Sequence, residues 1–342
     1  MATAAKKKGR ARKSFAIDLH AHVIHPELIE FSKAHVPYQG PPKGVNLSAA
    51  QKKKIIRHRE RIVSRFMDVK TRIREMDKAR VDIQVLTGSL VHQCTYWAKP
   101  AESLRMERIS NDALAETIAA KPDRFRGLGG VPLQSTRHAI KELERCMGEL
   151  GLSGVQISSR AGSKDLGHPS LDPFWKRARE LGALIVIHPA GITDARYAKW
   201  ALWNSVGQSL EETMAMSYLF YEGVMDRFPK LNILIAHGGG YLPYYIGRHD
   251  RNYIDKAPTR VNMSKSPSAY LRQFYYDSCV YDRDVFEFLV RKVGAGRILM
   301  GSDYPVGEDD PIGFVRNSRK ISAADKEKIL WKNAARLLGI KV

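Results

Sequence analysis

Short apolar runs rich in β-branched residues recur along the chain, and amphipathic stretches separate them. The runs predict eight strands, at residues 15–20, 83–87, 126–131, 154–158, 184–188, 233–237, 274–277 and 298–301. The stretches predict helices over about 69–80, 102–120, 137–150, 172–182, 209–227, 243–254, 283–293 and 323–338. Strands that alternate with helices indicate parallel βαβ units, and eight such units predict a closed (β/α)8 barrel of the TIM type.

An open, doubly wound sheet is the alternative arrangement of the same elements. That fold would carry a G-x-G-x-x-G sequence after its first strand, and this sequence has none there. Residues 23–68 are too many for an ordinary βα loop. They predict a partly helical insertion after the first strand that could cover the site as a lid. The expected organisation is a flexible basic tail at 1–14 and one barrel domain at 15–342, with the insertion at 23–68.

The composition is that of an ordinary globular protein, with 342 residues, 44% hydrophobic and 27% charged. The sequence has no apolar run near the roughly 18–20 residues that span a bilayer, so we expect no integral membrane protein. The first residues carry charge but no apolar segment of a secretory signal. Three cysteines without a C-x-x-C pair exclude a disulfide scaffold and favour the cytoplasm.

The formal net charge is +20, and it is concentrated in two stretches. Residues 6–13 carry six cations, and residues 51–80 carry twelve Lys or Arg against four Asp or Glu. Such clusters can bind nucleic acid, but no helix-turn-helix, zinc-finger or RNA-binding signature accompanies them. We therefore interpret them as a solvated tail and a basic insertion that attracts anionic substrates.

Metal-competent side chains stand at the ends of four predicted strands, and they are the strongest chemical signal in the sequence. Side chains at i and i+2 of a strand point the same way, so His20 and His22 share one space. His188, His237 and Asp303 each follow another apolar run. The carboxyl ends of barrel strands meet at one mouth, and imidazole with carboxylate suits zinc or a similar divalent ion. The pattern predicts a metal site.

The motifs His20-Ala-His22, His188-Pro189, His237-Gly-Gly-Gly and Gly301-Ser-Asp303-Tyr-Pro305 resemble the amidohydrolase superfamily. Within it, they are similar to the branch of amidohydrolase-related decarboxylases, over about residues 15–340. The resemblance implies that His20, His22, His188 and Asp303 hold one divalent ion, usually zinc, with manganese as the alternative. It also implies that His237 stays unligated beside the ion as the acid–base residue.

The resemblance implies a metal-dependent, non-oxidative decarboxylase of a conjugated or aromatic carboxylic acid, without a redox cofactor. A hydrolase or hydratase on the same scaffold is the alternative, because function depends on the pocket rather than on the fold. The sequence departs from the branch after Pro189, where Ala190-Gly191 replaces an aromatic residue, and after Pro305, where Val306-Gly307-Glu308 follows. These departures predict an altered pocket, and hydroxybenzoates become candidate substrates.

Two arginines are expected to bind the substrate carboxylate, because a guanidinium pairs with it through two parallel hydrogen bonds. The resemblance implies a homodimer in which Arg248, eleven residues after His237, reaches the site of the neighbouring subunit. It implies a second arginine from the insertion. Arg61 and Arg65 are both candidates, and Arg65 is preferred.

Overall fold

The computed structural model describes residues 15–35, 46–89, 95–190 and 194–341; the predicted basic tail at 1–14 lies outside them. Eight parallel strands form one sheet whose spatial order is the chain order. They are β1 (Ile17–Val23), β2 (Ile83–Gly88), β3 (Phe125–Gly130), β4 (Gly154–Ile157), β7 (Leu184–Ile187), β8 (Asn232–Ile235), β9 (Tyr275–Asp277) and β10 (Ile298–Leu299). All eight strand predictions are confirmed, and the doubly wound alternative is wrong because the strand order never reverses.

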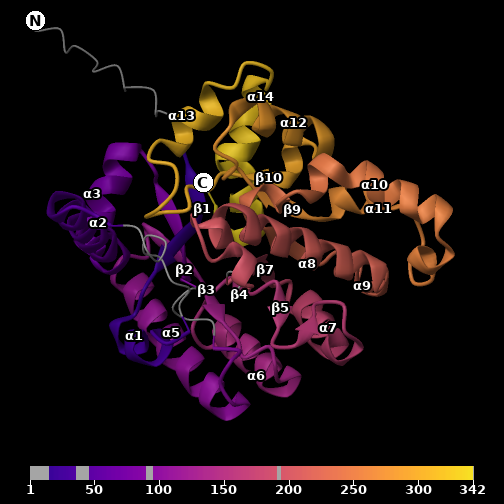
Figure 1. Ribbon diagram of the computed structural model, residues 1–342, viewed down its shortest axis with the longest axis horizontal. Coiled ribbons are helices and arrows are strands. Elements are labelled where there is room, and N and C mark those ends of the chain that lie inside the picture. The colour runs from indigo at the N-terminus through magenta and orange to yellow at the C-terminus, as the bar shows by residue number, and fades with distance from the viewer. Residues whose placement is uncertain (1–14, 36–45, 90–94, 191–193, 342) are drawn as a thin grey trace, which may run out of the picture.

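The first and last strands meet and complete the barrel. The Leu19 N–H donates to the Met300 carbonyl at 2.9 Å, and the His22 N–H donates to the Tyr304 carbonyl at 2.8 Å. Helices surround the strands on the outside (Figure 1). The predicted (β/α)8 barrel is therefore confirmed.

The helices that cover the barrel lie close to their predicted ranges. They are α3 (Val69–Ala79), α5 (Pro100–Ala120), α6 (Thr136–Gly148), α7 (Asp172–Leu181), α8 (Ser209–Tyr221), α10 (Leu242–Asp255) and α12 (Arg283–Val293). The helix expected at 209–227 is interrupted at Gly223, whose φ is 73°, so that α9 (Val224–Arg227) is separate. The last helix consists of α14 (Ala323–Glu327), a π-helical turn at Lys328–Lys332 and α15 (Asn333–Leu338). No helix in the described part of the chain is long and apolar enough to span a membrane.

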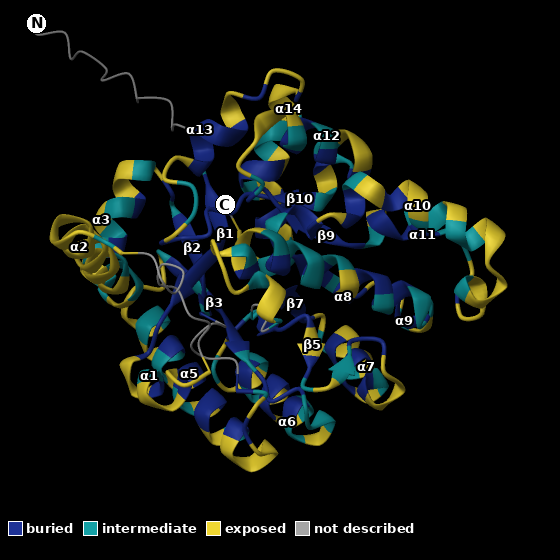
Figure 2. Ribbon diagram, viewed as in Figure 1, coloured by how far each residue is buried: buried dark blue, intermediate teal, exposed yellow. Residues whose placement is uncertain are grey.

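The insertion contributes α1 (Pro26–Ser32) and α2 (Ala49–Met67). A capping box starts α2, since the Ser48 side chain accepts from the Gln51 N–H and the Gln51 side chain accepts from the Ser48 N–H. None of the residues of α2 is buried, and the helix stands at the rim of the molecule (Figure 2). The function of the insertion as a lid stays a prediction. The chain also contains α11 (Pro267–Tyr270), α13 (Pro311–Arg316) and a hairpin of β5 (Arg160–Ala161) and β6 (Lys164–Asp165), which the pattern did not predict.

The core has two layers, one between the strands and the surrounding helices and one inside the barrel. Ala334 and Ala335 of α15 join the inner layer, and Trp331 packs edge-on against Phe15 with ring centroids 6.0 Å apart. These residues close the end of the barrel at which the strands begin. The opposite end, at which the strands finish, is where barrel enzymes carry their active sites.

Glu107 of α5 is a buried acid whose ionisation should change stability with pH. Burial raises its pKa to about 8, although the Thr95 hydroxyl donates to it at 2.5 Å. The folded chain thus keeps a proton that the unfolded chain loses near pH ~4.3, so the free energy of unfolding falls as pH rises between these values. We expect Glu107→Gln to gain stability relative to the natural chain over that window, by up to about a few kcal/mol at pH 8 and above. Urea unfolding of both proteins at pH 5 and pH 8.5 tests this, and a difference independent of pH contradicts it.

Candidate metal centre and active site

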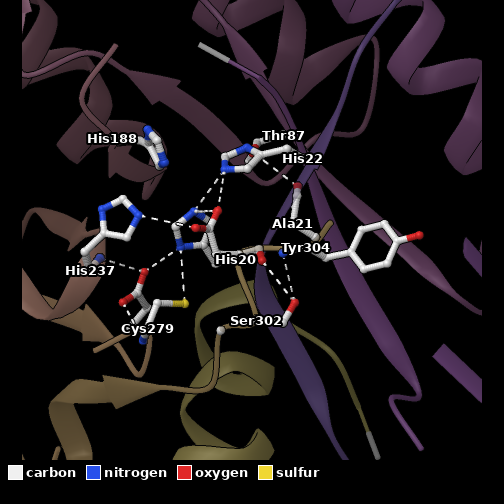
Figure 3. A network of polar contacts seen from close by, with 12 residues as sticks. His20, Ala21, His22, Thr87, His188, His237, Cys279, Ser302 and Tyr304 are labelled. Carbon is white, nitrogen blue, oxygen red and sulfur yellow. Dashed lines mark hydrogen bonds and ion pairs between the residues drawn. The ribbon is translucent and has the colours of Figure 1, made fainter. Parts of the chain in front are cut away.

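Four histidines meet at the carboxyl end of the strands (Figure 3), and Asp303 lies among them. The imidazoles of His20, His22, His188 and His237 lie in contact, with ring centroids of neighbouring pairs 4.8–5.3 Å apart. The pairing of β1 with β2 shifts register between Asp18 and Ala21, so His20 lies within an irregularity of the strand. The sequence prediction that these side chains converge is confirmed.

Each imidazole is oriented by a hydrogen bond at Nδ1. His20 Nδ1 donates to Asp277 at 2.6 Å, and His22 Nδ1 donates to the Thr87 hydroxyl at 3.0 Å, since that hydroxyl donates to the Ala21 carbonyl. His188 Nδ1 donates to the Pro189 carbonyl at 3.0 Å, and His237 Nδ1 contacts Glu212 at 2.5 Å. Such outer partners fix the tautomer of metal-binding histidines.

The Nε2 atoms gather around the Asp303 carboxylate. Its Oδ1 lies 3.4 Å from His20 Nε2 and 3.2 Å from His22 Nε2, and its Oδ2 lies 3.7 Å from His237 Nε2. One ligand atom from each of His20, His188, His237 and Asp303 fits within 4.8 Å of the others. The donor set and its outer partners therefore fit a divalent ion. The division between four ligands and an unligated His237 stays a prediction.

The charges of the cluster are unequal. Burial lowers the pKa of His188 well below its usual value, and the neighbouring histidines lower it further, so this imidazole is neutral at pH 7. Burial would raise the pKa of Asp303, but the histidines outweigh it and hold that pKa well below its usual range. Burial would also lower the pKa of His237, but Glu212 and Asp303 raise it well above its usual value. Burial would lower the pKa of His20 too, but Asp303 and Asp277 raise it above its usual value. The cluster thus combines neutral imidazole, a carboxylate and imidazoles whose affinity for a proton is raised.

The chain turns sharply after β8 to set His237 in place. Residues His237, Gly238, Gly239 and Gly240 all have positive φ, at 47°, 62°, 82° and 60°. Glycine adopts this conformation without strain. A Cβ on Gly240 would lie 2.1 Å from the Ser209 carbonyl of α8, so the third glycine lets this helix approach. The approach brings Glu212 of α8 to His237.

Three residues of the site were missed in the sequence. Asp277, at the end of β9, binds His20 and accepts from the N–H groups of His237, Gly238 and Cys279, each at 3.0 Å. The sequence did signal Asp277, because it ends the predicted strand at 274–277, and Asp303 likewise follows the predicted strand at 298–301. Glu212 lies on a helix without such a signal. Tyr281 lies on the loop after β9, and its hydroxyl donates to Asp303 Oδ2 at 2.9 Å.

A cavity of about 590 Å³ opens beside His237 and Asp303. Apart from these two residues its described lining is uncharged and mostly apolar, and the polar groups in it are amides and phenols, from Asn204, Gln208, Tyr241, Tyr244 and Tyr281. Among the described residues that line it, none is Lys or Arg. An anionic substrate would therefore need a cation from the metal or from outside this lining.

The predicted arginines are not part of this cluster. Arg65 donates to Glu75 at 2.8 Å and to the Pro305 carbonyl at 2.7 Å, and it stacks on Tyr304. It lines a second cavity, of about 560 Å³, together with Arg61. Arg248 is exposed on α10 and forms no ion pair with a described residue. Their substrate-binding roles stay predictions.

Residues 17–340 match the family described as amidohydrolase. The chain is 34% identical to 2-amino-3-carboxymuconate-6-semialdehyde decarboxylase of Dictyostelium discoideum, over 96% of this chain and 92% of the relative. The motifs quoted above resemble this enzyme in particular, and the predicted resemblance to the amidohydrolase-related decarboxylases is confirmed. Gamma-resorcylate decarboxylase of Polaromonas sp. (strain JS666 / ATCC BAA-500) is 29% identical over 80% of this chain and 88% of its own length.

A similar fold occurs in the crystal structure of 2,6-dihydroxybenzoate decarboxylase complexed with 2,6-dihydroxybenzoate. The TM-score is 0.82 and the identity 25%, over 96% of this chain and 99% of that one.

Proposed function

The chain belongs to the amidohydrolase family, and from this premise we propose that it is a metal-dependent, non-oxidative decarboxylase of an aromatic or conjugated carboxylic acid. The observation that carries the proposal is the buried set of imidazoles and one carboxylate at the end of an uncharged cavity. Relatives that align with nearly the whole chain are decarboxylases. A cytoplasmic location is part of the proposal, since the described cysteines Cys146 and Cys279 are unpaired.

In this proposal His20, His22, His188 and Asp303 hold one divalent ion, with zinc preferred and manganese as the alternative. The neutral imidazoles supply nitrogen and Asp303 supplies oxygen, which is a set that both ions accept. When bound, the ion polarises a substrate oxygen and lowers the pKa of water.

His237 supplies the proton in the reaction. Glu212 holds its Nδ1, so the proton at Nε2 points toward the cavity. The proton goes to the carbon that bears the carboxylate and interrupts conjugation there. The bond to the carboxylate then breaks, its electron pair restores conjugation, and CO2 leaves. The Glu212–His237 pair regains a proton from water, which balances the reaction.

Product analysis tests the proposed reaction. The metal-loaded protein is incubated with hydroxybenzoates and with carboxylated muconates, and CO2 and the organic product are measured. We expect stoichiometric CO2 with one of these substrates. Turnover of lactones, amides or unsaturated acids without CO2 would establish the alternative hydrolase or hydratase on the same scaffold.

A homodimer completes the proposed site. The cavity lacks Lys and Arg among its described lining residues, and a carboxylate buried without a cation is costly. Arg248 is exposed on α10, so it is available to a neighbouring subunit. We propose that Arg248 of the partner subunit binds the substrate carboxylate.

Mixing two inactive variants tests this arrangement. His237→Ala and Arg248→Ala are each expected to be nearly inactive alone. In a mixed dimer one of the two sites has both residues intact, so equal mixing should restore roughly one quarter of the natural activity. Subunit exchange is verified with two affinity tags. Exchange without recovered activity argues against a shared site, and a fully active Arg248→Ala argues against any role in substrate binding.

A further inference from the structure

Arg72 of α3 is a buried cation outside the metal cluster. Its side chain is 1% exposed, and it makes no ion pair within 4.0 Å with a described carboxylate. Its Nη2 donates to the His22 carbonyl at 2.5 Å, and its Nη1 donates to the Gln84 side-chain oxygen at 2.7 Å. Burying a charge without a counter-charge is unfavourable. The burial of Arg72 against neutral hydrogen-bond acceptors therefore calls for a structural explanation.

The His22 carbonyl lacks its regular partner in the sheet. The His22 N–H binds the Tyr304 carbonyl, so in a parallel ladder the His22 carbonyl would accept from the N–H of Val306. The chain turns away at this point, and the N–H groups of Val306 and Gly307 bind the Asp303 carbonyl instead, each at 2.9 Å. The guanidinium of Arg72 supplies the missing donor.

A second branch of the same network reaches the other proposed ligands. Gln84 donates to Asp18 Oδ2 at 2.9 Å. Asp18 in turn accepts from the His20 N–H at 3.2 Å and from the Ser302 N–H at 2.9 Å. Ser302 directly precedes Asp303. The network thus holds the backbone at all three ligand positions contributed by β1 and the loop after β10.

The ring of Tyr304 completes the contacts. Arg72 lies over this ring, 4.4 Å from its centroid. In Figure 3 the ring points away from the histidine cluster, and Arg72 contacts this ring rather than the imidazoles. It touches neither an imidazole of the cluster nor the cavity beside His237.

We propose that Arg72 is a positioning residue: it fixes the backbone that carries His20, His22 and Asp303, and thereby sets the affinity of the site for its divalent ion. The inference rests on the proposed function, since it assumes that these residues bind metal. Outer partners of metal ligands commonly change metal affinity by about 10–100-fold when they are removed.

The test measures metal binding directly. Arg72→Met keeps most of the side-chain volume and removes the donors. The dissociation constants of zinc and manganese for the metal-free protein are measured by competition with a chelating dye, together with the melting temperature. We expect the dissociation constant to rise about 10–100-fold. At saturating metal, the rate of CO2 release should stay within a few-fold of that of the natural chain, because Arg72 does not reach the cavity.

Arg124→Met is the matched control. The Arg124 guanidinium also donates to backbone carbonyls, to Asp82 at 2.9 Å and to Val81 at 3.1 Å, but at the end of the barrel where β2 begins. Its loss should lower the melting temperature and leave metal affinity unchanged. Equal losses of affinity in both variants mean that Arg72 is merely structural. Unchanged affinity in folded Arg72→Met overturns the proposal.

Arg72 also approaches the Arg65 and Phe66 carbonyls at the end of α2, at 3.5 and 3.4 Å, so its loss could prevent folding. In that event Gln84→Met, which cuts only the branch to Asp18, must weaken metal binding for the proposal to stand. Arg72→Lys, which keeps the cation and one donor, should lie between Arg72→Met and the natural chain. If the natural chain itself binds no divalent ion, the proposed metal-dependent function is refuted. This outcome differs from a failure of the Arg72 proposal alone, in which the natural chain binds metal and Arg72→Met binds it equally well.

Discussion

Replacing His237 by alanine is expected to reduce CO2 release by roughly 10²–10⁴-fold, the usual loss for a general acid–base residue. Its Nε2 faces the cavity, and its Nδ1 is held by Glu212. Burial raises the pKa of Glu212 to about 7, although the neighbouring imidazole of His237 lowers it. The other three histidines of the cluster, His20, His22 and His188, are all predicted to bind the metal, so none of them can replace His237 as the proton donor. The metal content should remain at about one ion per chain. Initial rates and elemental analysis of the same preparations give both results.

His249→Ala is a suitable control for that experiment. His249 lies on α10 and contacts the Tyr221 hydroxyl at 3.1 Å, away from the described lining of the cavity. Its loss should leave the rate within a few-fold of the natural value. If His237→Ala instead loses its metal, His237 is a ligand, and the predicted division of the histidines is wrong.

His188→Ala should lose the ion and, with it, measurable activity. His188 is the ligand candidate whose removal disturbs the fold least, because its Nδ1 binds only the carbonyl of the adjacent Pro189. In contrast, His20 is bonded to Asp277 at the end of β9, and Asp303 is bonded to Tyr281 on the loop after β9. Three ligands in place of four should raise the metal dissociation constant by at least about 10²-fold, since even indirect partners account for 10–100-fold.

The measurement is metal content after dialysis, followed by rates over a series of added zinc and manganese concentrations. An unchanged melting temperature of the metal-free protein would separate ligand loss from misfolding. Exposed His168 provides the control, since His168→Ala removes an imidazole remote from the cluster. Full activity of metal-free His188→Ala would contradict the proposed metal dependence.

The strand pattern was sufficient to predict the barrel because each strand is a short apolar run between amphipathic helices. It was also sufficient to predict that the ligand candidates lie close together, since a polar residue that ends an apolar run must lie at the mouth of a parallel barrel. His188 and Asp303 follow this rule directly. Asp277 follows it as well and could have been included.

The pattern could not predict residues that act from helices or loops. Glu212 reaches His237, and Arg72 reaches the His22 carbonyl, because α8 and α3 lie at particular rotations and heights against the barrel. These placements depend on tertiary packing rather than on local sequence. The contacts of Arg65 likewise depend on packing, since its guanidinium binds Glu75 and the Pro305 carbonyl, and its role at the substrate stays a prediction.

The way in which the barrel closes also constrains how this chain folds as it is made. β1 pairs on one side with β2 and on the other with residues 300–304, and Ala334 and Ala335 complete the inner core. A nascent chain therefore exposes the open edge of its first strand until almost all of the barrel has been synthesised. Contacts so distant in sequence slow folding and prolong exposure to aggregation. Dependence on chaperones during translation is the expected consequence, and ribosome-bound chains stopped before and after residue 335 would reveal it through their protease sensitivity.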